Sequence, residues 1–91
     1  MPTKVHCAHI LVDTLTEAEA VLERLARGEK FANVAKAVSR CPSRRRGGDL
    51  GSFARGQMVR EFETAAFALQ KGQLAPITKT KFGYHVIKRL D

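Results

Sequence analysis

Two apolar segments, one near each end of the chain, constrain the fold most. Residues 4–13, KVHCAHILVD, are rich in β-branched side chains, contain no glycine or proline, and have the length of one long strand. Residues 82–90, FGYHVIKRL, have the same character, with Gly83 near their start. We therefore predict that both segments are strands and that they pair with each other.

Helical patterns fill much of the sequence between these two strands. Thr16 and Glu19 have the spacing of a capping box at the start of the first helix. Pro42 and the pair Gly47-Gly48 predict that residues 40–48 form a loop. The other predicted elements are helices within 14–30, 31–39 and 59–70 and strands at 49–55 and 76–80. The expected order is βααβαββ, in one α+β domain that spans residues 1–91.

Composition narrows the class of protein. A chain of 91 residues with 44% hydrophobic side chains suits one small domain with its own core. Two cysteines, Cys7 and Cys41, are too few for a disulfide framework and predict reduced thiols. The N-terminal residues contain no apolar run long enough for a signal peptide or a membrane span. We therefore expect a soluble, cytoplasmic protein.

Cys41, His9 and His85 are the residues that could carry covalent chemistry. A cysteine hydrolase needs a thiolate, a base, and usually a third group that orients the base. Cys41 precedes a proline, which favours extended backbone at Cys41. Activated thiolates occur instead at helix N-termini, so we favour an unreactive thiol over a nucleophile. A zinc site is also disfavoured, because His6 and Cys7 point to opposite strand faces and no C-x-x-C pair is present. His6 is expected at the surface.

Large apolar residues predict either core or the lining of a pocket. The set comprises Leu50, Phe53, Met58, Phe62 and Phe82. Met58 follows the turn sequence ARGQ and stands at a helix start, which is typical of a pocket rim. Met and Phe side chains suit a flat, apolar ring. If the two terminal strands are neighbours, His9 and His85 would face each other, share a proton and form the floor of this pocket.

One feature favours nucleic-acid binding, namely the run of Arg44, Arg45 and Arg46. Sixteen basic and nine acidic residues give a net charge of +7, which favours acidic partners or polyanions. Single-strand binders interleave aromatic with basic side chains, whereas the five Phe and one Tyr here fall mostly on apolar stripes. No known nucleic-acid motif is visible. We interpret the run as a solvated basic loop and disfavour nucleic acid and acidic surfaces as partners.

Five sequence blocks occur in order over nearly the whole chain. They are CAHILV (7–12), GEKFANVAKAVS (28–39), CPSRRRGGDLGSFARGQMV (41–59), FETAAFAL (62–69) and FGYHVIK (82–88). Together they resemble the parvulins, the small peptidyl-prolyl cis/trans isomerases. The combination of GGDLGSFARGQM with FGYHVIK is specific. The resemblance implies a four-stranded antiparallel sheet surrounded by about four helices.

The resemblance also implies isomerase activity in a groove on the sheet, without a metal or cofactor. His9 and His85 would be the paired histidines of the active centre, with Cys41 beside them. Thr80 matches a threonine of the hydrogen-bond network around these histidines. The substrate-binding set implied in this way is Leu50, Phe53, Met58, Phe62 and Phe82, with Phe53 supporting the proline pocket from its strand.

An isomerase of this kind makes and breaks no covalent bond, so it need only bind the twisted amide better than either planar form. We expect a monomer that acts on proline-containing polypeptides in unfolded or flexible chains. A chaperone-like domain that uses the same groove for binding alone is one alternative. A basic nucleic-acid-binding module is the other, and it would bind with a steep salt dependence.

Two departures from the phospho-specific parvulins bear on the substrate. Those relatives carry basic residues after the first strand, where this chain has DTLTE at 13–17. Phe82 and Val59 stand where such relatives have polar residues, so they make the groove more apolar. We therefore predict a preference for a hydrophobic or uncharged residue X before the proline.

Overall fold

The computed structural model describes residues 3–91 and contains one four-stranded sheet. All strand pairs are antiparallel, in the order β2-β1-β4-β3. The strands are β1 (Lys4–Val12), β2 (Asp49–Ala54), β3 (Thr78–Thr80) and β4 (Gly83–Arg89). The helices are α1 (Leu15–Ala26), α2 (Phe31–Val38) and α3 (Arg60–Phe67), with a 3-10 helix η1 (Pro42–Arg46). The α+β class and the order βααβαββ are confirmed, with η1 added before β2.

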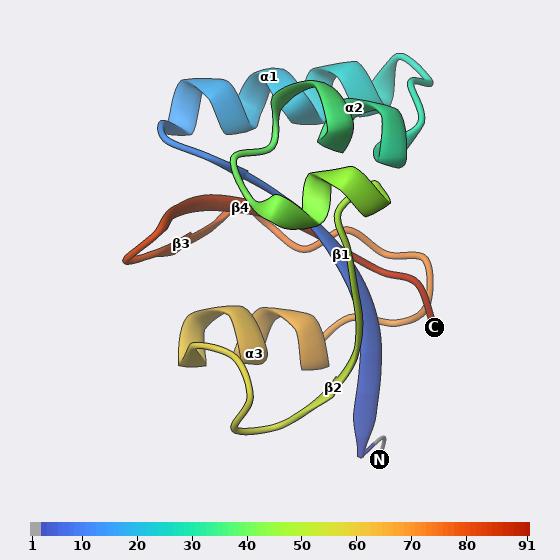
Figure 1. Cartoon of the computed structure of the whole chain (residues 1–91), viewed down its shortest axis with the longest axis vertical. Coiled ribbons are helices and arrows are strands. Elements are labelled where there is room, and N and C mark those ends of the chain that lie inside the picture. The colour runs from blue at the N-terminus through green and yellow to red at the C-terminus, as the bar shows by residue number, and fades with distance from the viewer. Residues whose placement is uncertain (1–2) are drawn as a thin grey trace.

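The two strands from opposite ends of the chain pair at the centre of the sheet, as predicted. Leu11 of β1 lies opposite His85 of β4, and His9 lies opposite Ile87. In Figure 1, α1 and α2 lie on one side of this central pair and α3 lies on the other. Both faces of β1 are therefore covered, which explains why the strand is apolar along both faces.

Each face of the sheet has its own apolar core. On the α1 and α2 side, Ile10 and Val86 pack against Val21 and Val34. On the α3 side, Val5 and Ile87 pack against Phe62 and its neighbours. His9 and His85 are buried in the sheet between these apolar residues. The two cores thus fix β1 and β4 rigidly on either side of the histidines.

Two local predictions are corrected by the structure. Residues 42–46 form a 3-10 helix instead of an open loop, because Pro42 fixes a helical φ at its first position and Gly47, at φ +68°, ends it. The cap of α1 is Thr14 with Glu17 instead of Thr16 with Glu19: the Glu17 N–H donates to Thr14 Oγ1 at 3.2 Å. The N-cap of the helix therefore lies two residues earlier than the capping box at Thr16 and Glu19 predicted.

Gly48 joins η1 to the sheet. The His9 N–H donates to the Gly48 carbonyl at 3.0 Å, and Gly48 has a φ of +84°. A Cβ at this position would collide with the His9 carbonyl oxygen, so only glycine allows the backbones to approach so closely. This contact sets Asp49 and Leu50 beside the middle of β1.

None of the helices formed by residues 3–91 combines the length and the apolar character that crossing a bilayer requires.

Candidate functional site

A groove of about 480 Å³ opens where the central strands meet η1 and the start of α3. It brings together most of the residues that the sequence singled out: His9, Cys41, Leu50, Met58, Phe62, Phe82 and His85. Leu11, Arg40, Pro42 and Gln57 also line it and were not predicted, because no local pattern distinguishes them from core or loop residues. The groove is lined mainly by apolar side chains.

Phe53 lies behind the groove instead of lining it. Its side chain is buried, and its ring centre is 5.9 Å from that of Phe62. Phe53 therefore supports a wall residue from the core, the role that the resemblance implied, and it is not among the residues that line the groove. Its place on β2 turns the ring toward the α3 core.

His9 and His85 form a hydrogen-bonded pair at the inner end of the groove. Their Nδ1 atoms are 2.9 Å apart, and the two rings stack with centres separated by 5.1 Å. One Nδ1 must carry a proton and the other must accept it, so the contact fits two neutral rings. Burial, and next the proximity of His85, lower the pKa of His9 from 6.5 to about 4. Burial also lowers the pKa of His85.

Thr80 extends this pair into a chain of hydrogen bonds. Its Oγ1 is 2.7 Å from His85 Nε2 and accepts from the Phe82 N–H at 3.1 Å. The direction of the Thr80 hydroxyl therefore sets the tautomer of both imidazoles. With either direction, His9 Nε2 is buried and has no hydrogen-bond partner among the described residues.

Phe62 packs its ring against both histidines. The ring centres are 5.4 Å from His9 and 5.3 Å from His85, with interplanar angles of 80° and 81°. Edge-to-face contacts of this kind add stability beyond the area they bury. Because Phe62 is only 3% exposed and comes from the first turns of α3, it also ties that helix to the sheet.

Cys41 lies on the wall of the groove with extended backbone, as the following proline predicted. Its thiol is half-buried and free. The buried Ser39 fixes its position, since Ser39 Oγ accepts from the Leu11 N–H at 3.1 Å and the Cys41 N–H at 3.4 Å. Sequence reasoning missed Ser39, because a serine at the end of a helical segment is usually only a cap.

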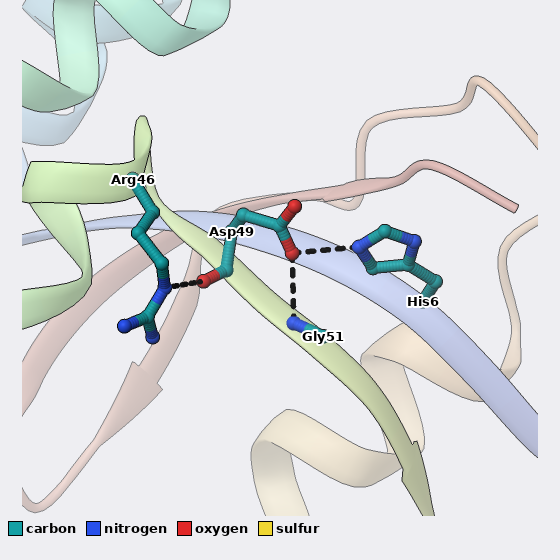
Figure 2. Close-up of polar contacts among 4 residues, drawn as sticks. All are labelled: His6, Arg46, Asp49 and Gly51. Atoms are coloured by element: carbon teal, nitrogen blue, oxygen red, sulfur yellow. Dashed lines mark hydrogen bonds and ion pairs between the residues drawn. The ribbon is translucent and has the colours of Figure 1, made fainter.

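A second polar cluster lies beside the groove at the start of β2. His6 Nε2 lies 2.6 Å from Asp49 Oδ1, which also accepts from the Gly51 N–H at 2.7 Å. Figure 2 shows both contacts. The Gly51 N–H, and then His6 and Arg46, hold the pKa of Asp49 below its usual range. The His6 side chain is 31% exposed, which agrees with the expected place at the surface. The cluster fastens β2 to β1 next to Leu50.

Comparisons with known proteins agree with this arrangement. The profile of the Rotamase family, described as the PPIC-type PPIase domain, matches residues 9–91. The foldase protein PrsA of Geobacillus sp. (strain WCH70) is 47% identical over 97% of this chain, which corresponds to 32% of that protein. The chain thus spans about a third of the length of the curated relatives it matches.

Two solved structures match along almost their whole length. NmPin, the parvulin of Nitrosopumilus maritimus, is 46% identical with a TM-score of 0.90, and the match covers 100% of this chain and 99% of that one. CsPin from Cenarcheaum symbiosum is 53% identical with a TM-score of 0.86, over 100% of this chain and 95% of that one. In sequence and in fold, this chain belongs to the PPIC-type PPIase family, the parvulins.

Proposed function

We propose that this chain is a peptidyl-prolyl cis/trans isomerase that acts on proline-containing polypeptides. The observation that carries the proposal is an apolar groove that ends on a neutral, hydrogen-bonded histidine pair. Family membership supports the same reaction.

The reaction places unusual demands on a site. Amide resonance gives the peptide bond a rotation barrier of about 18–20 kcal/mol, and X-Pro bonds isomerise unaided in tens to hundreds of seconds. No covalent bond forms or breaks, so the site must bind the twisted amide more tightly than either planar form. Leu50, Met58 and Phe62 offer the prolyl ring an apolar seat while the preceding carbonyl turns.

The histidines and Cys41 suit the turning carbonyl because they bear little charge. A twisted amide has lost resonance, so its oxygen is less negative than that of the planar amide. Two imidazoles kept neutral by burial present no cation that would favour the planar form. The Cys41 thiol, a weak donor on the groove wall, acts through position and not as a nucleophile.

Met58→Ala is expected to lower kcat/KM for an X-Pro peptide by about tenfold, because a loss of 1.4 kcal/mol of transition-state binding has that effect. Cys41→Ala should lower it less. Turnover is measured by NMR exchange, with a melting curve for each variant. Leu22→Ala is the matched control, since Leu22 is a half-buried apolar side chain that packs on the opposite core. A Met58→Ala protein that is folded and fully active would contradict this role.

The groove should favour a hydrophobic or uncharged residue X before the proline. Phe82, at 58% exposure, and Val59 present apolar surface along it. The guanidinium of Arg40, also on its lining, is paired with Asp13 at 3.2 Å. In a peptide series that varies only X, Leu or Phe should give a higher kcat/KM than Glu. Fastest turnover with Glu or phosphoserine at X would refute the preference.

We further propose that residues 1–91 form one domain that acts as a monomer in the cytoplasm. The large exposed apolar side chains among residues 3–91 are Leu15 in α1, Leu74 between α3 and β3, and Phe82 between β3 and β4. They come from three different parts of the chain, which supports the monomer. The free Cys7 and Cys41 thiols support a reducing compartment. Sedimentation analysis of the purified chain tests the monomer, and fractionation of the source cells tests the compartment.

A further inference from the structure

A second cavity adjoins the groove on the side of η1. It has a volume of about 550 Å³ and is lined by Val38, Ser39, Arg40, Pro42, Arg44 and Arg45. Arg40 and Pro42 line both this cavity and the groove, so the two lie next to each other. No acidic side chain is among the residues that line it. A polypeptide seated in the groove can therefore reach this basic cavity.

The arginines of this region differ in whether their guanidinium groups already have a partner in the protein. Arg40 is paired with Asp13. Arg46 Nε donates to the Asp49 carbonyl at 3.3 Å, and Figure 2 shows this contact. Arg44 and Arg45 are exposed, and neither side chain makes a hydrogen bond or ion pair within residues 3–91. These two guanidinium groups are the ones left to receive an external anion.

The backbone that carries these two arginines is held firmly. The Arg44 N–H donates to the Cys41 carbonyl at 3.0 Å, and the Gly47 N–H donates to the Arg44 carbonyl at 2.9 Å. Gly47 packs so closely on Ala32 of α2 that a Cβ there would overlap that side chain. A rigid support lowers the entropy cost of binding to the exposed side chains.

We propose that Arg44 and Arg45 receive an acidic side chain of the bound polypeptide, at a position outside the X-Pro pair. This inference rests on the proposed isomerase function and specifies its substrate class. It differs from the preference at X, because X lies in the apolar groove and the acidic residue lies beyond it. A polypeptide fits better than single-stranded nucleic acid, because no aromatic side chain lines the cavity for a base to stack on.

The test moves one glutamate along an otherwise neutral peptide with a fixed Leu-Pro pair, and compares each peptide with its glutamine counterpart. At one or two positions on one side of the proline, Glu should raise kcat/KM over Gln by about two- to fivefold, the range of an exposed ion pair. Added salt should reduce this ratio. The double variant Arg44→Gln/Arg45→Gln should bring it near one.

The control is Lys4→Gln/Lys71→Gln, which removes the same charge from exposed residues that line neither cavity, and which should keep the wild-type ratio. If wild type accelerates none of the peptides, the isomerase proposal itself fails. If it accelerates them and Glu equals Gln at every position, the isomerase stands and this inference is wrong. An oligothymidine that displaces the Glu peptide and binds more tightly would overturn it in favour of nucleic acid.

Discussion

Replacing Phe62 with alanine is expected to lower the free energy of unfolding by about 3–5 kcal/mol, the usual cost of removing a buried phenylalanine ring. The ring is 3% exposed and contacts both histidines and Phe53, so little can collapse into the space it leaves. A domain of this size has only about 5–15 kcal/mol of stability in total. Urea unfolding measures the loss, and most of the isomerase activity should disappear with it.

Two further variants separate the contribution of Phe62 to stability from its contribution to turnover in the groove. Phe67 lies in the same helix, packs on Phe53 and does not line the groove. Phe67→Ala should therefore lower the stability and leave the turnover of the folded protein unchanged. Phe62→Leu keeps most of the buried volume, so it should fold, yet lose turnover because the flat ring is missing. A folded Phe62→Leu protein with wild-type kcat/KM would show that Phe62 serves only the core.

The sequence was sufficient to predict the central strand pair and the facing histidines. Both strands have an apolar, buried centre, and a histidine inside each of them has few other places to lie once the strands pair. The cluster of Leu50, Met58 and Phe62 around the groove followed from the parvulin-like sequence blocks. These features depend on strong, repeated signals spread over many residues.

The parts that sequence reasoning missed depend on single contacts between distant residues. The hydrogen bond from His6 to Asp49 joins residues 43 positions apart, and it follows a register shift between His6 and Ala8 in the pairing of β1 with β2. A one-residue irregularity of this kind leaves no pattern in the sequence. The 3-10 helix was missed for a similar reason, because proline, serine and glycine are equally common in loops.

Acidification is expected to destabilise the protein at pH values where its carboxylates are still ionised. The pKa of His9 lies at about 4 in the folded chain, against 6.5 ordinarily. Between these values the unfolded chain binds more protons, so the free energy of unfolding decreases as the pH falls. The contribution is complete above pH 6.5 and is lost progressively toward pH 4, by about 3 kcal/mol for His9 alone. The lowered pKa of His85 acts in the same direction.

Urea unfolding at half-unit steps from pH 7.5 to 4.5 measures this loss. The window ends above the ordinary pKa of Asp49 and at that of Glu29, and both pKa values are lowered in the folded chain, so most of the decline reports histidines. His9→Leu should flatten the profile, since leucine fills a similar volume and cannot be protonated. His6→Gln is the control for the third histidine, because it removes the contact with Asp49 and leaves the buried pair intact. Equal flattening by both variants would mean that the decline is not specific to the buried pair. A wild-type profile that is already flat would mean that the buried pair accepts protons in the folded protein. The groove floor would then be charged at mildly acidic pH, and the proposal that a neutral pair favours the twisted amide would no longer hold there.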